Sequence, residues 1–561
     1  MSTPVLEIEG LRIAVDGGAS EGSSEEVVRG VSLSIRPGAT TCLVGESGSG
    51  KSLTALATMG LLPSNLAVTG GDIRLNGESI VGARPGRLRD LRATRMSMIF
   101  QEPMTALNPV ARVGPQVGEV LKAHTVLTAS ERRDRVLAML DRVHLPDPER
   151  LYKAFPHQLS GGQRQRIMIA MALILQPQLL IADEPTTALD VTTQAQILTL
   201  LEELRREEGT AVLFITHDMG VVADIADDVT VLRLGQVMET QPVGALLRAP
   251  RTDYTRELLR AVPSQIPRAP RPVPPNAAVA LATESLGKVY RDAGWFGTGR
   301  EVVAAEAVTL RLLAGRTLGI VGESGSGKST VARCILRLID PTAGSIMLGS
   351  AETARLSRRE MKPYRRKIQI VFQDPMRSLN PRIEVGESII EGPTNFGVPR
   401  RAALERAAEL LELVGLPRSA LDRYPHQFSG GQRQRIAIAR ALALEPEVLV
   451  ADEAVSALDV SIQAQVLALL AEIQGRLGIG MLFITHDLGV AAQVCDDVVV
   501  MQSGRVVEYG PAARVLTEPE ADYTRRLLEA APGRDWDFAN FRPLARPETG
   551  DGQPAAVRAG A

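Results

Sequence analysis

Cysteine is scarce in this sequence. Its 561 residues include only three, Cys42, Cys334 and Cys495, which are far apart and sit in apolar stretches. This pattern predicts buried, reduced thiols of the kind found in cytosolic proteins. Because no two of them stand at the spacing of a metal-ligand pair, we expect neither a zinc site nor an iron–sulfur cluster.

Long apolar runs and an excess of one charge are also missing. No uninterrupted apolar run reaches the ~18 residues needed to span a bilayer. The formal net charge is -2, which lacks the basic surplus typical of proteins that bind nucleic acid. The first ten residues, with Glu7 and Glu9, lack the basic-then-apolar order of a signal peptide. The remaining composition, 45% hydrophobic and 23% charged, is that of a globular protein.

One octapeptide is present twice without change and matches the phosphate-binding pattern G-x-x-x-x-G-K-[ST]. Its glycines let backbone N–H groups turn toward a phosphate, and the helix that follows adds its positive end. The lysine supplies a full charge, and the last serine can hold Mg²⁺. The copies are Gly45, Glu46, Ser47, Gly48, Ser49, Gly50, Lys51, Ser52 and Gly322, Glu323, Ser324, Gly325, Ser326, Gly327, Lys328, Ser329.

The two P-loops belong to a longer duplication. The pairs Ser160/Ser429, Asp183/Asp452, His217/His486 and Tyr254/Tyr523 are each 269 positions apart. A period of this size predicts a duplicated domain. We expect domains over residues 1–262 and 279–535, an extended proline-rich linker over 263–278, and a disordered tail over 536–561.

The hydrophobic pattern predicts an α/β fold for each domain. Apolar and polar residues alternate over the first ~40 residues, as in antiparallel strands. Residues ~102–160 are predicted to be mainly helical. Residues 179–182 and 211–215 are continuous apolar runs, typical of parallel strands buried on both faces.

Two carboxylates end a buried strand in each half. Asp183 and Asp452 suit Mg²⁺, whereas Glu184 and Glu453 can reach and polarise an attacking water. Taken alone, such a pair could equally be a solvated acidic turn. An upstream P-loop favours the catalytic interpretation.

A second repeated motif supplies a serine hydroxyl and glycine N–H groups at a helix start, which together form an anion site. It consists of Ser160, Gly161, Gly162, Gln163 and of Ser429, Gly430, Gly431, Gln432. With this motif the sequence resembles the ATP-binding cassette (ABC) ATPases over roughly residues 5–535. The resemblance implies two tandem nucleotide-binding domains. Each would have a RecA-like P-loop core, an antiparallel β subdomain and a helical subdomain.

The resemblance also implies residue roles. Gln101 and Gln373 match the Q-loop, which senses Mg²⁺ and water and contacts the transmembrane partner. His217 and His486 match the switch histidine that reads the γ-phosphate. Residues 187–190 and 456–459 match the D-loop. Tyr290 matches the adenine-stacking aromatic, but the first half has Val15 at that position, which leaves its stacking residue open.

In the family each signature closes over the P-loop of the other domain, so the halves should form a head-to-tail pseudo-dimer. One ATP site should then combine Lys51, Glu184 and His217 with Ser429 and Gly431. The other should combine Lys328, Glu453 and His486 with Ser160 and Gly162. ATP and Mg²⁺ are the implied substrate and cofactor, and both sites should hydrolyse ATP.

Residues 101–109 and 373–381, and the Asp-Tyr-Thr segments at 253–255 and 522–524, resemble the oligopeptide/dipeptide/nickel importer ATPases. This implies an ATPase subunit of a peptide importer, bound peripherally to the cytoplasmic face of the inner membrane. Its partners would be two permease subunits and an extracytoplasmic binding protein, which select the cargo. A soluble twin-cassette ATPase acting on ribosomes and an exporter ATPase stay open as alternatives. The short proline-rich linker argues against the first, and the end segments argue against the second.

Overall fold

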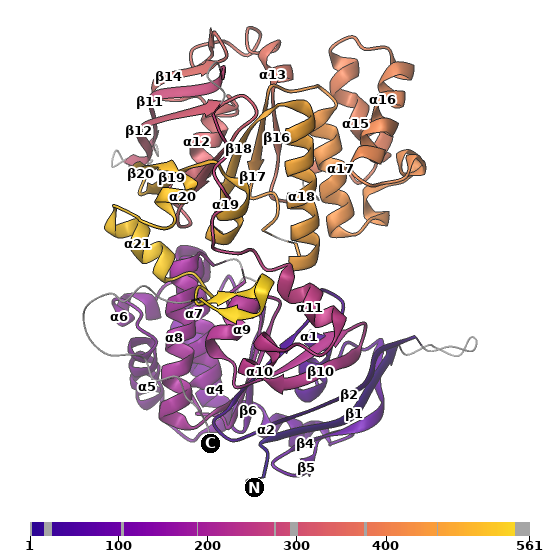
Figure 1. Ribbon diagram of the computed structural model, residues 1–561. Coiled ribbons are helices and arrows are strands. Elements are labelled where there is room, and N and C mark those ends of the chain that lie inside the picture. Colours follow the sequence, from indigo (N-terminus) through magenta and orange to yellow (C-terminus); the bar gives the residue numbers. More distant parts are fainter. Residues whose placement is uncertain are drawn as a thin grey trace.

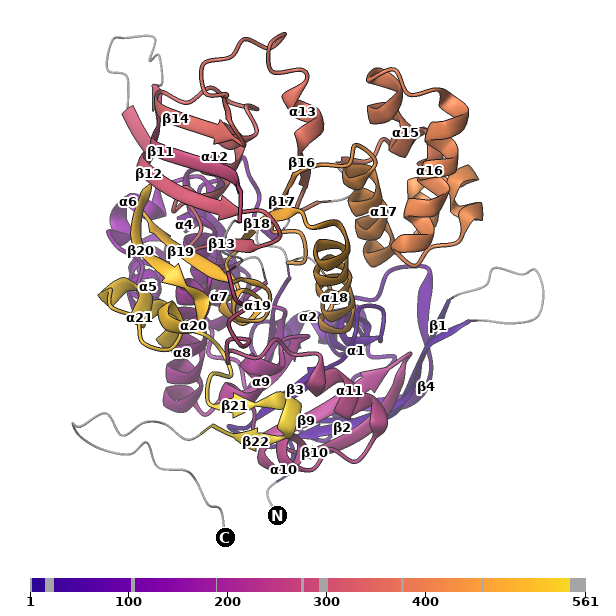
Figure 2. The same cartoon turned by 45° about the horizontal axis from the view of Figure 1, so that its top comes forward.

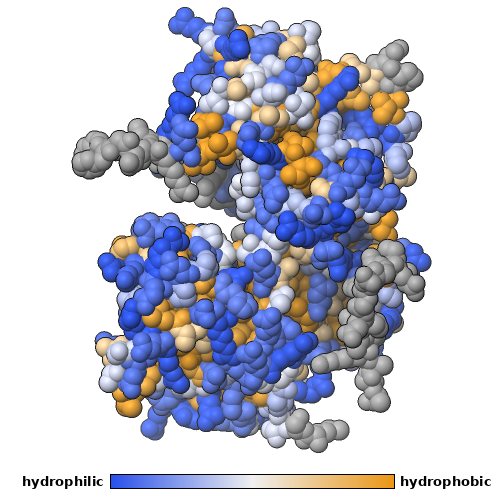
Figure 3. All heavy atoms as spheres, turned by 90° about the vertical axis from the view of Figure 1, so that its left-hand side faces the viewer, coloured by the Kyte–Doolittle hydropathy of each residue, from blue (hydrophilic) through white to orange (hydrophobic). Residues whose placement is uncertain are grey.

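The structure is a computed structural model that describes residues 3–15, 25–101, 106–187, 189–273, 277–291, 301–374, 378–456 and 458–544. Two lobes follow one another along the chain, the first at the bottom and the second at the top of Figure 1. Each lobe combines two sheets with surrounding helices, which confirms the predicted α/β class. Figure 3 shows the lobes joined at a waist beside a hollow.

Each lobe is built on a six-stranded sheet whose inner strands are parallel. The first sheet runs β10 (Gln236–Pro242), β9 (Asp228–Arg233), β3 (Thr40–Val44), β8 (Ala211–Thr216), β7 (Leu179–Asp183), β6 (Met96–Ile99). The second runs β16 (Ile368–Val371), β17 (Val448–Asp452), β18 (Gly480–Thr485), β13 (Thr317–Val321), β19 (Asp497–Gln502), β20 (Arg505–Pro511). Strands β7 and β8 are buried throughout, as their continuous apolar sequences predicted, and β3 is buried throughout as well.

A four-stranded antiparallel sheet completes each lobe. Its strands are β2 (Glu26–Ile35), β1 (Leu6–Val15), β4 (Leu66–Leu75), β5 (Glu78–Ser79) in the first, and β12 (Glu301–Leu313), β11 (Val279–Arg291), β14 (Ala343–Leu348), β15 (Ala351–Glu352) in the second. Leu6, Ile8 and Leu11 of β1 point into the core while Glu9 is exposed. The alternating pattern therefore reports one buried face.

Helices position the motifs around these sheets. The P-loops lead into α1 (Lys51–Thr58) and α12 (Lys328–Ile335), and the signatures into α7 (Gly161–Leu173) and α17 (Gly430–Leu442). The helical parts contain α4 (Val113–His124), α5 (Ala129–Arg142), α6 (Pro148–Tyr152), α15 (Val385–Asn395) and α16 (Arg400–Leu413). The remaining helices are α2 (Pro85–Leu91), α8 (Val191–Glu208), α9 (Met219–Ile225), α10 (Val243–Arg248), α11 (Asp253–Arg260), α13 (Tyr364–Lys367), α18 (Val460–Leu477), α19 (Leu488–Val494), α20 (Ala512–Val515), α21 (Asp522–Glu529).

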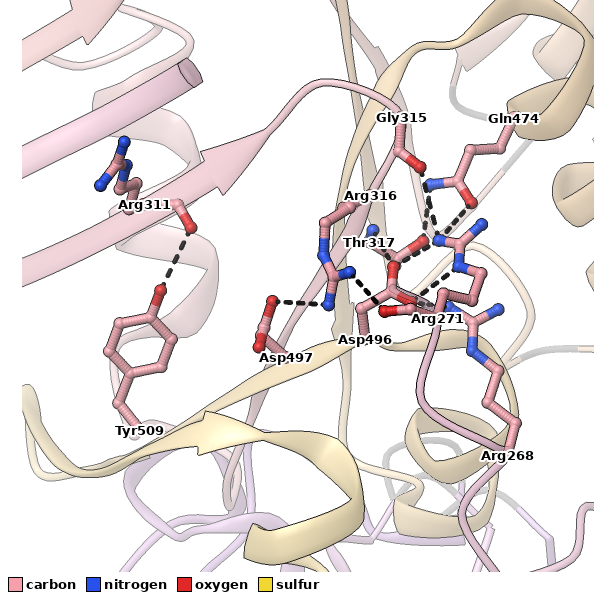
Figure 4. Close-up of polar contacts among 10 residues, drawn as sticks. All are labelled: Arg268, Arg271, Arg311, Gly315, Arg316, Thr317, Gln474, Asp496, Asp497 and Tyr509. Atoms are coloured by element: carbon pink, nitrogen blue, oxygen red, sulfur yellow. Dashed lines mark hydrogen bonds and ion pairs between the residues drawn. The ribbon is translucent and has the colours of Figure 1, made fainter. Parts of the chain in front are cut away.

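The proline-rich linker docks on the second lobe. Arg268 N donates to Ala492 O at 3.0 Å, and the Arg268 guanidinium lies 2.8 Å from the buried Asp496 carboxylate. Arg271 Nε donates to the same carboxylate at 2.8 Å. Figure 4 shows both arginines pointing at Asp496. Burial alone would raise the pKa of Asp496, but these arginines and Thr317 N–H hold it below its usual value.

The tail expected to be disordered over 536–561 is instead ordered as far as Leu544. β21 (Trp536–Asp537) pairs with β22 (Arg542–Pro543) around the turn η4 (Phe538–Asn540). Phe538 is buried in the core of the first lobe, with Trp536 and Phe541 packed beside it. Figure 2 shows this hairpin beside β10 and α10. The prediction rested on composition, since the tail is rich in Gly, Pro and Arg. Three aromatic side chains nevertheless bury enough area to order this segment. Residues 545–561 lie outside the described residues.

The segment that follows each lobe packs against the other lobe, and the two contacts are equivalent. Pro263 and Pro532 stand 269 positions apart. A Cβ added at Gly489 would lie 2.8 Å from Pro263 O, and one added at Gly220 would lie 2.8 Å from Pro532 O. Each segment therefore packs against the helix that follows the histidine of the other lobe, where only glycine leaves room.

We expect Phe538→Ala to destabilise the first lobe by about 3 kcal/mol, because it empties a buried aromatic site. Thermal unfolding monitored by calorimetry will measure this. Phe372→Ala is the matched control, since Phe372 is 40% exposed. Equal thermal unfolding midpoints for both variants would show that Phe538 of the hairpin does not stabilise the first lobe.

A second stability prediction concerns Asp224, whose carboxylate accepts Gly533 N–H at 3.1 Å. Burial raises its pKa to about 7. The folded protein therefore retains a proton that the unfolded chain releases near pH 4, and this group lowers stability as pH rises from about 4 to about 7. Asp224→Asn should raise the unfolding midpoint at pH 8, and the difference should vanish toward pH 4. A pH-independent difference would contradict the protonation argument.

Candidate functional site

The P-loops are shaped by glycines at positive φ, where other residues are strained. Gly45, Gly48 and Gly50 have φ values of 150°, 77° and 98°. A Cβ at Gly45 would lie 2.2 Å from Leu232 O, and one at Gly322 would lie 2.2 Å from Met501 O. The backbone therefore curls tightly between strand and helix, as the octapeptide predicted.

A lysine is held inside each loop. Lys51 Nζ donates to Gly45 O at 2.7 Å and to Glu46 O at 2.9 Å. Lys328 makes the same two bonds to Gly322 and Glu323. Burial lowers the pKa of Lys51, although nearby carboxylates, Glu184 foremost, oppose that shift. A phosphate at this position would meet a desolvated cation, where a charge–charge contact is strongest.

Oxygen ligands suited to Mg²⁺ converge beside each lysine. Ser52 Oγ donates to Asp183 Oδ1 at 3.1 Å, and Ser329 Oγ to Asp452 Oδ1 at 3.2 Å. Burial raises the pKa of Asp183 to about 6 against the pull of Ser52 and Lys51. A hydroxyl and a buried carboxylate are hard oxygen donors, and a divalent cation would return Asp183 to its charged form. These residues fit the predicted metal.

In each lobe, the glutamate that follows the buried strand contacts the Q-loop glutamine and the switch histidine of the same lobe. Glu184 Oε2 accepts Gln101 Nε2–H at 2.9 Å, and Glu184 Oε1 lies 3.2 Å from His217 Nδ1. Glu453 Oε2 accepts Gln373 Nε2–H at 2.8 Å, and Glu453 Oε1 lies 3.5 Å from His486 Nδ1. The structure thus brings together the three side chains that the motifs predicted from separate segments.

The electrostatics of this cluster favour an ionised glutamate. Burial would raise the pKa of Glu184, but hydrogen bonds from His217 and Thr187 and the charge of Lys51 lower it to about 2. The same carboxylate raises the pKa of His217 against the desolvation that lowers it. Glu184 and Glu453 also have positive φ values of 45° and 49°, a strained conformation that turns the carboxylate out of the strand.

The signature serines cap exposed helix starts. Ser160 Oγ accepts Gln163 N–H at 3.2 Å while Gln163 Oε1 accepts Ser160 N–H at 3.0 Å, and Ser429 and Gln432 repeat this capping box. A Cβ at Gly162 would lie 2.6 Å from Thr193 Cγ2, so close packing on α8 explains that glycine. Gly161 and Gly430 carry no such constraint, since an added Cβ there meets little or nothing.

Each P-loop is contacted by the other lobe. Ser47 N donates to Asp459 Oδ1 at 2.8 Å, and Thr192 Oγ1 donates to Glu323 Oε1 at 2.6 Å. Val191, beside Thr192, is buried within the core of the second lobe. The sequence matched Asp190 and Asp459 to the D-loop but did not predict these contacts, since pairing across 412 and 131 residues has no local signal.

A cavity of about 180 Å³ lies between the lobes. His217 and Thr187 line it from the first lobe, and His486 and Ser456 from the second. Phe538 of the C-terminal hairpin closes one side. Both histidines therefore face the same interlobe space.

Tyr290 is not joined to a P-loop by any contact among the described residues. It is 41% exposed near the end of β11, and the Lys288 ammonium lies 5.1 Å from its ring centroid. Val15, its counterpart, is half-buried at the end of β1. The adenine-stacking role of Tyr290 stays a prediction.

Comparison with protein families identifies the class. Residues 28–187 and 305–456 match the family model described as ABC transporter. Residues 238–298 match the model of the oligopeptide/dipeptide transporter C-terminal region. The cassette matches cover more than half of the chain, so this protein belongs to the ABC transporter ATPases and has two cassettes in one chain.

Individual relatives are similar over nearly the full length. The chain is 45% identical over 571 aligned residues to the glutathione import ATP-binding protein GsiA of Salmonella typhimurium, covering 95% of this chain and 90% of that one. It is 44% identical to the peptidoglycan transport ATP-binding protein YejF of Agrobacterium fabrum, covering 94% and 96%. The structure of cbiO1 from Clostridium perfringens aligns at 30% identity with a TM-score of 0.37, over 43% of this chain and 92% of that one. The family predicted from the motifs is confirmed.

We expect the double variant Lys51→Ala/Lys328→Ala to lose ATP binding, because both charge-assisted phosphate contacts disappear. Equilibrium binding of a fluorescent ATP analogue will measure this. Lys367→Ala is the control, since its ammonium pairs with Glu447 at 2.7 Å rather than lying in a P-loop. Retained affinity in the double variant would refute the P-loop assignment.

Proposed function

We propose that this protein is the ATP-hydrolysing subunit of an importer for di- or oligopeptides or related small peptides, with two active composite sites. The observation that carries the proposal is the pair of contacts from each lobe to the P-loop of the other. The peptide class is supported by the C-terminal region match and by relatives named for glutathione import and peptidoglycan transport.

In the proposed first site, Lys51 binds the phosphates, and Ser52, Asp183 and Gln101 would hold Mg²⁺. Bound Mg²⁺ would neutralise charge on the phosphate oxygens. Glu184, ionised and fixed by Gln101 and His217, orients the attacking water. Its ionised carboxylate polarises that water.

His217 contacts the γ-phosphate, and Ser429 with Gly431 closes the first site from the second lobe. In the second site the same roles belong to Lys328, Ser329, Asp452, Gln373, Glu453 and His486, closed by Ser160 and Gly162. Both carboxylates make the same contacts with glutamine and histidine, which supports turnover at both sites.

The surfaces beside the Q-loops support two permease partners. A groove of about 320 Å³ in the second lobe is lined by residues that include Gln369, Phe372 and Arg440. Arg440 donates to Glu391 there at 2.9 Å, whereas the first lobe has Met171 at the equivalent position. This difference in residue type between the lobes supports two different permease subunits.

None of the described helices is long and apolar enough to cross a membrane. We propose peripheral binding at the cytoplasmic face of the inner membrane through these permeases, which receive cargo from an extracytoplasmic binding protein. Affinity purification from detergent-solubilised membranes tests this partnership. Recovery of permeases supports it, and recovery of ribosomes instead would favour the ribosome-acting alternative.

The composite arrangement predicts an order of activities. Glu184→Gln should silence the first site, so adding Ser429→Arg, which closes that same site, should cost little more. Adding Ser160→Arg to Glu184→Gln should remove most of the remaining ATPase activity, because it blocks the second site. Steady-state phosphate release will compare the two double variants. Higher activity in the Ser160 combination than in the Ser429 combination would contradict the head-to-tail arrangement.

A further inference from the structure

A tyrosine contacts the P-loop backbone in each lobe. Glu46 N–H donates to the Tyr254 hydroxyl oxygen at 3.4 Å, and Glu323 N–H donates to the Tyr523 hydroxyl oxygen at 3.2 Å. The tyrosines are only 6% and 7% exposed. They belong to the Asp-Tyr-Thr segments at the end of each half. These segments take no part in the proposed hydrolysis or permease binding.

Both tyrosines are rigidly held. Glu239 of β10 accepts Arg251 N–H at 3.0 Å and the Thr252 hydroxyl at 3.0 Å, just before α11 begins. Glu508 of β20 accepts Glu520 N–H at 3.0 Å and Ala521 N–H at 3.2 Å, just before α21. A buried carboxylate thus fixes the start of each helix to the sheet, and the residue after each tyrosine, Thr255 or Thr524, is fully buried.

The tyrosines also stand beside the contact between lobes. The next N–H along the first P-loop, that of Ser47, donates to Asp459 of the other lobe at 2.8 Å. Burial and the charges of Glu46 and Asp459 raise the pKa of Tyr254 to about 12. Burial and the charges of Glu323 and Asp190 likewise raise that of Tyr523. Each hydroxyl therefore remains protonated and lies near the D-loop aspartate of the opposite lobe.

A loop with three left-handed glycines needs such external support. The Gly45–Glu46 peptide starts the turn that aims the later N–H groups at the phosphates. If its N–H lost its partner, only the bond from Lys51 Nζ to Gly45 O would hold this peptide, and part of the cost of ordering the loop would be added to each ATP-binding event. A preorganised loop binds phosphate more tightly for the same contacts.

We propose that Tyr254 and Tyr523 are positioning residues for ATP binding, whose hydroxyl oxygens fix the P-loop peptides at Glu46 and Glu323 and tie the C-terminal helix of each lobe to its ATP site. This inference concerns the shared ATPase chemistry and does not depend on the proposed peptide cargo.

The test is the full-length double variant Tyr254→Phe/Tyr523→Phe, which keeps both rings, including the stacking of Arg233 over Tyr254 at 4.7 Å. Losing one weak hydrogen bond per site should raise the KM for ATP about three- to tenfold, with kcat and the thermal midpoint unchanged. Equilibrium binding of a fluorescent ATP analogue should weaken by the same factor, so binding rather than chemistry is measured.

Tyr509→Phe is the matched control. Its hydroxyl donates to Arg311 O at 3.2 Å, as Figure 4 shows, and Tyr509 is 40% exposed, so the variant loses a similar bond away from any P-loop. It should leave KM unchanged. The proposal is overturned if the double variant keeps the wild-type KM and ATP affinity. It is also overturned if the variant changes only kcat or only the thermal midpoint, because a purely structural tyrosine would do the latter.

Discussion

The organisation of this protein depends on which groups form hydrogen bonds with the backbone of its two short glycine-rich P-loops. The first P-loop is fixed by groups from three places: its own lysine, the tyrosine of its C-terminal helix and the D-loop aspartate of the other lobe. Glycines at positive φ make the loop flexible on its own. Each of these three contacts therefore helps to fix the backbone geometry that would bind a phosphate. Both P-loops are contacted by the opposite lobe.

The remaining architecture keeps the lobes in register for those contacts. The linker is clamped to the second lobe through Asp496, and the C-terminal hairpin returns to the first lobe through Phe538. Pro263 and Pro532 press on equivalent glycines, each next to the histidine of the opposite lobe. Fusing the cassettes therefore does more than raise their effective concentration, because the connecting segments are themselves part of the interface.

Sequence patterns predicted the parts of the site that obey local rules. The octapeptide requires its glycines because of close backbone approach, and buried parallel strands require continuous apolar runs, so both were predicted and both were found. Gln101, Glu184 and His217 were predicted from separate motifs and meet as expected. Their convergence follows from the parallel sheet, whose strands deliver them to one edge.

What the sequence did not predict depends on pairing between distant residues. The contact of Ser47 with Asp459 and that of Glu46 with Tyr254 have no periodicity to reveal them, although the two identical Asp-Tyr-Thr segments were a signal that a shared role existed. The tail was predicted to be disordered because of its composition. Composition alone does not reveal that Phe538 is buried in the core of the first lobe. Tyr290 was assigned from resemblance alone, and no described contact joins it to a P-loop.

We propose that each ATP is held between the lobes. The most direct measurement is a structure of the Glu184→Gln/Glu453→Gln variant trapped with ATP and Mg²⁺. We expect two nucleotides, one between the Lys51 loop and Ser429 and the other between the Lys328 loop and Ser160. Nucleotides contacted by the P-loop and signature of a single lobe would contradict this proposal.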